Sequence, residues 1–361
     1  MSKLDELIAE LCPDGVEYIK LGSICNLITT GKLNANAMVE NGKYPFFTCD
    51  ANPYRINEYA FDTTAIIISG NGSQVGHINF YQGKFNAYQR TYVLSEFNNI
   101  DVKYLLHYLK GNLKNYIILH SKKGSVPYIT MPMLKNFSVP IPPLPVQQEI
   151  VRILDNFTEL TAELTAELTA RRKQYEYYRD LLLTFGDDIS WCNLDEILKI
   201  RNGKDYKSFN VGNIPVYGSG GIMTYIDTYA YDKPSVLIPR KGSIDKLYYV
   251  EKPFWTVDTI FYTEIYTSKV IPKYVFYCLQ KERLEQYNTA GGVPSLTQTV
   301  LNKVKIPVPP IEEQERIVAI LDRFDALCND LTSGIPAEIE ARQKQYEYYR
   351  DKLLSFKEVT A

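Results

Sequence analysis

A long helical pattern within residues 140–185 constrains the fold of this chain more than any other feature. After a cluster of prolines, side chains recur at alternating intervals of three and four residues, mostly apolar, which is typical of a helix with a coiled-coil seam. At about 1.5 Å per residue this helix would extend roughly 50 Å, too far to be buried alone. It therefore needs a partner helix. The positions of the pattern are Ile150, Leu154, Phe157, Thr161, Leu164, Leu168, Arg171, Tyr175, Tyr178, Leu182 and Phe185.

The chain supplies a partner, because residues 307–356 repeat the same pattern. Both copies begin with a proline cluster, contain an Ile-Leu-Asp tripeptide and carry the octapeptide KQYEYYRD. Pro142 aligns with Pro309, whereas Tyr175 aligns with Tyr346, so the second copy has four extra residues. These residues fall around 332–336, where Gly and Pro predict that the second helix is broken into two pieces.

Each helical segment follows a globular segment of short strand-like runs and Gly-rich turns, and the two globular segments share the same order of signals. Gly31-Lys32 matches Gly203-Lys204, and Gly72-Ser73 matches Gly242-Ser243. We therefore expect an α+β fold with two mixed α/β domains and two long helical segments, in a tandem internal repeat. The predicted boundaries are a first domain at 1–145, a spacer helix at 146–186, a second domain at 187–312, and a distal helical segment at 313–361.

The two helical segments are more similar to each other than the two globular segments are. The helical segments are nearly identical, including charged residues that a coiled-coil seam does not require, while the globular segments have diverged. A recent duplication alone would leave equal similarity everywhere. This contrast predicts that both helical segments meet copies of one partner and that the globular domains meet different targets.

This organisation resembles the specificity subunit of type I restriction–modification systems. The resemblance covers essentially the whole chain and rests on the two Pro-rich entries, the two KQYEYYRD copies and the tetrapeptide TAEL at 161–164 and 165–168. It implies two target recognition domains that each read half of a split DNA site, on helices packed as an antiparallel coiled coil. It also implies a cytoplasmic complex with two methyltransferase subunits and restriction subunits. S-adenosylmethionine would belong to the methyltransferase, ATP and Mg to the restriction subunits, and no cofactor to this chain.

Polar residues on turns at matched places in both domains are the candidates for DNA contact. Asn, Gln and Arg can pair with base edges, while Lys and Ser more often hold phosphate. These candidates are Lys32, Asn71, Ser73, Gln74, Gln89, Arg90, Lys122, Lys123, Lys204, Arg240, Lys241, Ser243 and Lys246. Polar residues of the repeated helical segments are the candidates for contact with the methyltransferase subunit. These are Gln147, Lys173, Glu176, Arg179, Gln314, Lys344, Glu347 and Arg350.

Other function classes find less support. The formal charge of −2 neither favours nor excludes DNA, since a binding face needs only local basic density. Six scattered cysteines without a CxxC pair indicate a reducing compartment, and neither they nor three histidines suggest a metal site. The Gly-rich stretch 70–76 follows a strand but opens no helix, so we interpret it as a hairpin turn rather than a phosphate loop. Two alternatives stay open: a coiled-coil scaffold with two β-rich ligand-binding domains and, because of Asn52-Pro53-Tyr54, an adenine methyltransferase.

Overall fold

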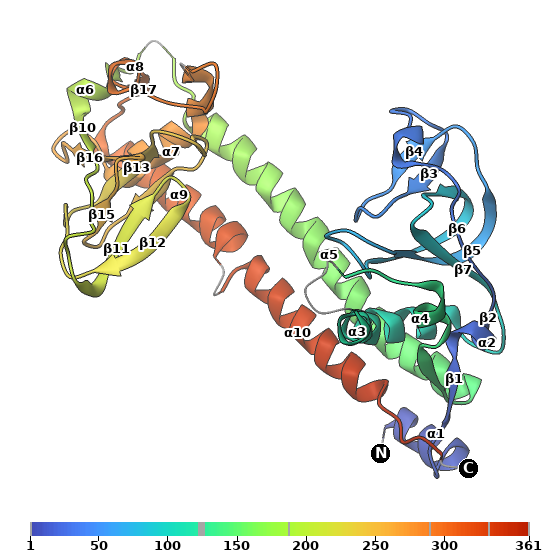
Figure 1. The fold of residues 1–361 in the computed structure, drawn as a ribbon. Helices are drawn as coiled ribbons and strands as arrows, with labels where there is room; N and C mark the ends of the chain where they lie inside the picture. The colour runs from blue at the N-terminus through green and yellow to red at the C-terminus, as the bar shows by residue number, and fades with distance from the viewer. Residues whose placement is uncertain (1, 122–126, 187, 289, 331–332, 360–361) are drawn as a thin grey trace. The chain divides into compact units, whose positions relative to one another are not determined.

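The computed structural model describes residues 2–121, 127–186, 188–288, 290–330 and 333–359, which form two compact units (Figure 1). Unit 1 contains Met1–Leu164 and Ile339–Ala361, and unit 2 contains Thr165–Glu338. Each unit therefore holds one globular domain, the beginning of the helical segment that follows it and the end of the other helical segment. The predicted two-domain α+β fold is confirmed.

The globular part of unit 1 is built on a six-stranded sheet with the order β2-β7-β5-β6-β3-β4. Neighbouring strands are antiparallel except β3 and β6, which run parallel. Helix α3 buries Leu105, Leu109 and Leu113, at four-residue spacing, in one core with Ile66 and Ile68 of β5. The elements are α1 (Lys3–Leu11), β1 (Glu17–Lys20), α2 (Leu21–Ile24), β2 (Cys25–Thr30), η1 (Ala35–Ala37), β3 (Tyr44–Phe47), β4 (Tyr54–Ile56), β5 (Phe61–Ser69), β6 (Ile78–Ala87), β7 (Thr91–Phe97), α3 (Val102–His120), α4 (Met131–Lys135) and β8 (Ser138–Ile141).

The globular part of unit 2 repeats this topology. The strand order β10-β16-β13-β14 corresponds to β2-β7-β5-β6, and β11 pairs antiparallel with β12 and parallel with β15, as β3 does with β4 and β6. The long β6 is thus represented by two short strands, β14 and β15. The elements are β9 (Trp191–Asn193), α6 (Leu194–Ile197), β10 (Leu198–Asn202), β11 (Val211–Gly218), β12 (Gly221–Ile226), β13 (Ser235–Pro239), β14 (Tyr248–Val250), β15 (Trp255–Thr256), β16 (Ile260–Ile265), α7 (Pro272–Lys281), η2 (Leu284–Tyr287), α8 (Gln298–Leu301) and β17 (Lys305–Pro307).

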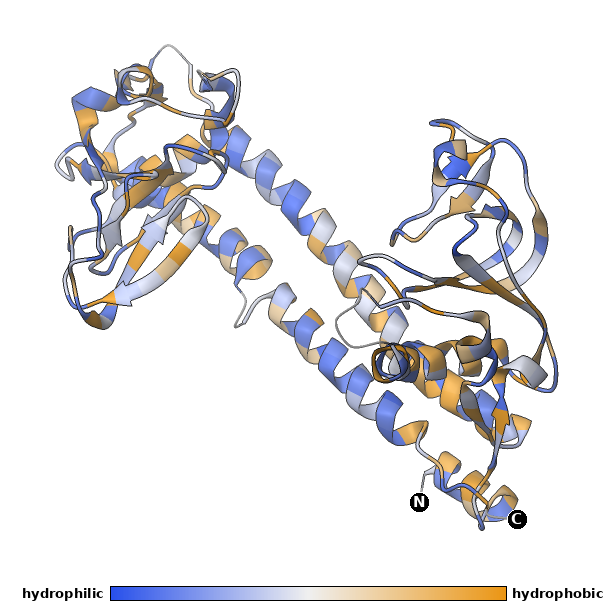
Figure 2. Ribbon diagram, viewed as in Figure 1, coloured by the Kyte–Doolittle hydropathy of each residue, from blue (hydrophilic) through white to orange (hydrophobic). Residues whose placement is uncertain are grey.

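The helical segments form α5 (Leu144–Leu182), α9 (Ile311–Asn329) and α10 (Ile335–Leu353). Helix α5 is continuous over 39 residues, and its first turns are more apolar than its middle (Figure 2). In unit 1 the start of α5 lies against α10, where the rings of Phe157 and Tyr349 stack with centroids 5.4 Å apart. In unit 2 the end of α5 lies against α9, where Tyr178 stacks on Phe324 at 5.6 Å. Within each unit the two helices run in opposite directions (Figure 1). Among the described residues, no helix is long and apolar enough to cross a membrane.

Both units attach their helices through the same polar contacts. In unit 1 the buried Gln147 side chain accepts a hydrogen bond from the Asp101 backbone N–H at 2.8 Å and donates one to the Pro142 carbonyl at 2.7 Å. Gln314 forms the same pair of bonds in unit 2, with the backbone N–H of Ile271 (2.8 Å) and the Pro309 carbonyl (2.8 Å). A buried carbonyl outside a regular ladder needs a hydrogen-bond donor, and the glutamine amide supplies it in both units.

A second repeated contact joins an aspartate of each helical segment to the helix that covers the sheet. Asp155 accepts hydrogen bonds from Lys103 at 2.6 Å and from His107 at 2.9 Å. At the matching place in unit 2, Asp322 pairs with Lys273 at 3.0 Å and accepts the Tyr277 hydroxyl. The two aspartates thus make corresponding contacts, with histidine in unit 1 at the place where unit 2 has tyrosine.

Candidate nucleic-acid interface

The predicted DNA-contact turns share two backbone features in both units. Gly72 and Gly242 take φ values of +84° and +83°, a conformation that favours glycine. The residue two positions before each glycine donates its N–H across the sheet, from Gly70 to the Arg90 carbonyl (2.9 Å) and from Arg240 to the Thr259 carbonyl (2.8 Å). The stretch 70–76 connects β5 to β6, so the hairpin interpretation is confirmed. A duplicated scaffold thus presents side chains of different chemistry.

In unit 1, three of the predicted residues line one hollow of about 260 Å³, with Thr30 and Tyr128 on its wall. Asn71 is half-buried, and its Oδ1 lies 3.0 Å from the Cys49 thiol. The Gln89 side-chain NH₂ donates to Asn34 Oδ1 at 2.8 Å, which leaves the Gln89 carbonyl oxygen available as an acceptor. Arg90 is exposed at the rim. This hollow therefore offers amide and guanidinium groups suited to base edges.

In unit 2 the corresponding turn is cationic. The Arg240 guanidinium lies 5.7 Å from the centroid of the Phe261 ring, which holds it by a cation–π contact. Lys241 and Lys246 are exposed and Ser243 is half-buried. The two units thus present different donor sets from the same backbone position.

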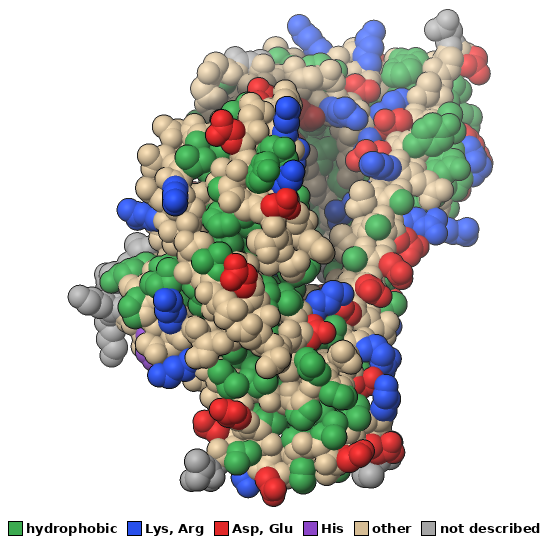
Figure 3. Space-filling model, turned by 90° about the vertical axis from the view of Figure 1, so that its right-hand side faces the viewer, with side chains coloured by type: hydrophobic (Ala, Val, Ile, Leu, Met, Phe, Trp, Pro, Cys, Tyr) green, Lys and Arg blue, Asp and Glu red, His purple; other side chains and the backbone are tan. Residues whose placement is uncertain are grey.

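The remaining DNA candidates divide into three groups. Ser73 and Gln74 are exposed and line a second hollow, beside α3. Lys32 and Lys204 are exposed, each after a glycine that packs so tightly on a carbonyl that a Cβ would clash with it. Lys122 and Lys123 lie outside the described residues. Over the face seen in Figure 3, basic side chains are interspersed with acidic ones rather than gathered in one patch.

The octapeptide KQYEYYRD separates into inward and outward residues. Lys173 and Glu176 of α5 are exposed, as are Lys344 and Glu347 of α10. Sequence reasoning missed Tyr177 and Tyr348, which are 64% and 62% exposed. A large aromatic ring exposed at the same place in both copies fits the central anchors of protein interfaces. The signal was available, because neither tyrosine falls on the predicted seam.

Four of the predicted partner-contact residues have internal roles instead. Gln147 and Gln314 are completely buried and bridge backbone groups within their own units, so they cannot meet a partner. Arg179 is also buried, packs 5.8 Å from the Tyr175 ring centroid and pairs with the adjacent Asp180. Arg350 repeats this arrangement with Tyr346, at 5.6 Å, and with Asp351. Their repetition is explained by packing within the chain.

His107 has an unusual electrostatic environment. Its ring is 3% exposed and lies between Asp155 Oδ1 and the Tyr346 hydroxyl, each 2.9 Å from a ring nitrogen. Burial lowers the pKa of His107, and the hydrogen bond with Asp155 offsets only part of this effect. Burial by itself raises the pKa of Asp155, but the hydrogen bonds from Lys103 and His107 outweigh it and hold this pKa below its usual value. This cluster links α3 to both long helices of unit 1.

No group of histidine, cysteine and acidic residues in the described part of the chain could hold a metal ion. All six cysteines are free thiols, four of them buried. The stretch Asn52-Pro53-Tyr54 leads into the short edge strand β4.

Comparison with known proteins agrees with this architecture. The sequence model of a family described as "Type I restriction modification DNA specificity domain" matches twice, at residues 13–171 and 187–341. A putative type I restriction enzyme specificity subunit of Haemophilus influenzae is 31% identical over 374 residues, covering 94% of this chain and 96% of that protein. The EcoR124I/EcoR124II specificity subunit of Escherichia coli is 38% identical over 257 residues, covering 62% and 63%. The crystal structure of an S subunit from M. genitalium, 19% identical, superposes with a TM-score of 0.59 over 94% of this chain and 96% of that one.

Proposed function

The chain belongs to the family of type I restriction–modification specificity subunits. On this basis we propose a function for each part of the chain. Each unit reads one half of a bipartite, asymmetric DNA site through the turns around Gly72 and Gly242. The chain performs no chemistry itself and binds no cofactor. Two methyltransferase subunits dock on the repeated helical surfaces, and each modifies an adenine flipped out of its half-site.

One observation carries this proposal: the two units share a frame but present different side chains at the turn. Asn71 lies on the first turn, beside Gln89 and Arg90 of the neighbouring turn between β6 and β7, while Arg240 and Lys241 lie on the second. A scaffold that binds one ligand twice has no need for this difference, whereas a reader of two unlike half-sites requires it. The family relationship also speaks against the scaffold and methyltransferase alternatives.

We propose that α5 acts as a spacer that sets the number of unread base pairs between the half-sites. Removal of Thr165–Leu168 shortens the helix by about 6 Å. Since a base pair adds about 3.4 Å along the duplex, the gap should shrink by one to two base pairs while both half-sites stay the same. The variant Thr165→Ala keeps the length of the helix and is the matched control, with no change expected in the gap.

The test is the adenine methylome of a methylation-free host that expresses this chain with its methyltransferase subunit. We expect a split, asymmetric motif with a fixed gap. A continuous motif, or no methylation despite a soluble complex, contradicts the assignment of two readers. The same host carrying the Thr165–Leu168 deletion tests the spacer, and a change in the recognised bases rather than in the gap contradicts it. The proposed compartment is the cytoplasm, and the full complex would add restriction subunits that use ATP and Mg.

A further inference from the structure

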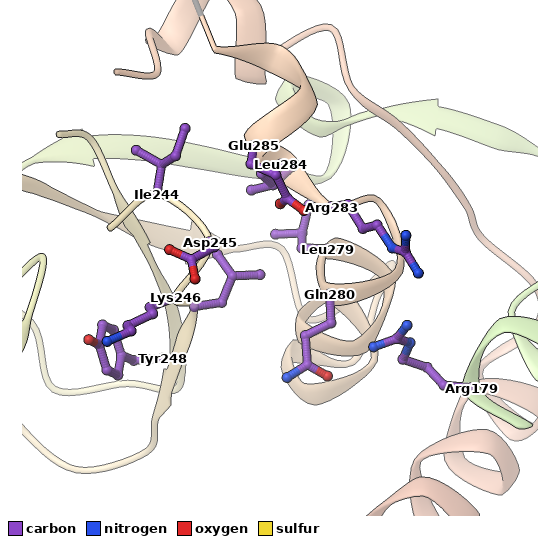
Figure 4. Close-up of a pocket in the computed structure, with 11 residues that line it drawn as sticks. Arg179, Ile244, Asp245, Lys246, Tyr248, Leu279, Gln280, Arg283, Leu284 and Glu285 are labelled. Carbon is purple, nitrogen blue, oxygen red and sulfur yellow. The ribbon is translucent and has the colours of Figure 1, made fainter. Parts of the chain in front are cut away.

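Each unit contains a second hollow, just beyond its DNA-contact turn and against the helix that covers the sheet. In unit 1 it measures about 370 Å³ and lies between residues 73–78 and α3. In unit 2 it measures about 380 Å³ and lies between residues 244–248 and α7 (Figure 4). Leu109 and Leu279 line the two hollows, each five residues after the tyrosine that bonds a proline carbonyl. The hollows are therefore equivalent places in the duplicated fold.

Cationic side chains line both hollows, but they come from different positions. In unit 1 they are Lys110 and Lys114, one turn apart on α3, and no acidic side chain lines this hollow. Two like charges at this spacing repel each other, and Asp155 already attracts Lys110. The other polar side chains on the wall are Ser73, Gln74 and His77, and the first two can donate hydrogen bonds to an anion.

In unit 2 the cations are Arg179, Lys246 and Arg283. The guanidinium groups of Arg179 and Arg283 lie on one side of this hollow, and Lys246 comes from the opposite wall, where its charged end points toward Tyr248 and away from Arg283 (Figure 4). Asp245 and Glu285 also line this hollow, so its positive charge is partly balanced. Arg179 already pairs with Asp180 and Lys246 points the other way, which leaves Arg283 as the group that can take a new anion.

The backbone at Arg283 supports a functional role for its side chain. Arg283 has φ +47° and ψ +69°, a left-handed conformation that is uncommon for residues other than glycine. This conformation is strained for any residue other than glycine, and such strain is concentrated at ligand-binding positions. Glycine would fit this backbone without strain, yet the chain carries an arginine that faces a hollow.

We propose that each hollow binds a phosphate of the DNA backbone, through Lys110 and Lys114 in unit 1 and through Arg283 in unit 2. This inference rests on the proposed function. Phosphate contacts fix the register of a protein on the duplex without reading sequence. Equivalent hollows beside the two reading turns would hold each unit in the same register on its own half-site. Different cations serve the same purpose, since any phosphate can be held by lysine or arginine.

The test uses the complex of this chain with its methyltransferase subunit and a duplex that contains the methylated motif. Lys114→Ala and Arg283→Gly should each weaken binding roughly fivefold near 0.15 M salt and reduce the slope of log K against log salt by about 0.9. The methylated motif should stay the same. Arg283→Gly also relieves the backbone strain, so a loss of affinity with unchanged or higher thermal stability cannot come from misfolding. Lys199, which is exposed and lines neither hollow, supplies the control Lys199→Ala.

Three outcomes distinguish the possibilities. Unchanged affinity and salt slope in both variants overturn the phosphate proposal while the proposed function stands. Weaker assembly with the methyltransferase subunit, measured without DNA, would assign the hollows to an acidic partner surface and overturn it too. If the unaltered complex shows no preference for its motif over an unrelated duplex, the proposed function itself fails.

Discussion

The two units differ least where they hold the long helices and most where they present side chains on the turns. Gln147 and Gln314 make the same two hydrogen bonds, whereas the half-buried Asn71 stands where unit 2 has the exposed Lys241. A buried polar bridge tolerates little change, because each lost partner leaves an unsatisfied group. A turn whose backbone is fixed by a glycine accepts many side chains at little cost. The two copies thus keep the contacts that hold the long helices and vary the side chains on the turns.

The largest expected effect comes from removing a buried glutamine that attaches a long helix to its globular domain. Gln314→Ala leaves the Ile271 N–H and the Pro309 carbonyl unsatisfied, and should lower the free energy of unfolding of unit 2 by roughly 2–4 kcal/mol. Both tryptophans, Trp191 and Trp255, lie in unit 2, so fluorescence during urea unfolding reports on this unit.

Unit 1 provides the comparison for this prediction. Gln147→Ala should destabilise unit 1 by a similar amount, measured by hydrogen exchange in α3. Gln148→Ala, at the exposed neighbouring position, should leave stability nearly unchanged. A loss below about 0.5 kcal/mol for both buried variants would show that the repeated bridges are dispensable.

The second prediction tests the outward face of the octapeptide. Tyr177→Ala and Tyr348→Ala should each weaken the binding of one methyltransferase subunit by about 10- to 30-fold, as for an aromatic anchor at the centre of an interface. Titration calorimetry with the isolated methyltransferase subunit measures this. The double variant should lose both binding events.

The adjacent tyrosines supply the control for this surface. Tyr178 and Tyr349 stack on Phe324 and Phe157 inside their own units. Their replacement by Phe should preserve the stacking and the partner affinity. Unchanged affinity in the double variant Tyr177→Ala/Tyr348→Ala would place the docking surface elsewhere on the chain.

Features that depend on local backbone conformation could be predicted from the sequence, whereas features that depend on contacts between distant residues could not. Gly72 and Gly242 revealed the turns, because a left-handed backbone is a local requirement. Arg179 and Gln147 were assigned to the partner surface because polar residues are usually exposed. Arg179 is instead buried beside the Tyr175 ring, and Gln147 is buried where it donates to the Pro142 carbonyl. The helical pattern of the sequence reveals neither contact. Lys110 and Arg283 gave no signal, since a hollow exists only after α3 or α7 has packed on its sheet.

The third prediction uses a difference among the repeated contacts, His107 in unit 1 in place of Tyr277 in unit 2. Because the pKa of His107 is lowered in the folded chain, the unfolded chain binds the proton more tightly. Its contribution to stability is complete above about pH 6.5 and decreases as the pH falls from there toward the folded pKa. The lowered pKa of Asp155 adds a further loss below about pH 4.

The variant His107→Tyr should therefore reduce the loss of stability of unit 1 between pH 7.5 and 5.5, by up to about 1.4 kcal/mol per unit of pKa difference. Hydrogen exchange in α3 at the two pH values, corrected for intrinsic exchange, measures the change. His120→Tyr, at an exposed position, should keep the pH dependence of the original chain. An equal pH dependence in His107→Tyr and the original would assign the acid sensitivity to other groups.

The smallest expected effect concerns how Asn71 is oriented at the reading turn. The Cys49 thiol lies 3.0 Å from Asn71 Oδ1 and occupies that acceptor, which leaves the amide NH₂ to donate to a base. Cys49→Ala frees the oxygen, so the amide can turn and accept as well as donate. One position of the first half-site should then become about three- to tenfold less selective, within the 1–3 kcal/mol that a good base contact supplies. Methylation rates on duplexes with single substitutions measure this. Cys49→Ser retains a donor and should preserve selectivity, and the second half-site should be read as before by both variants, because Arg240 is held by Phe261 and not by a thiol.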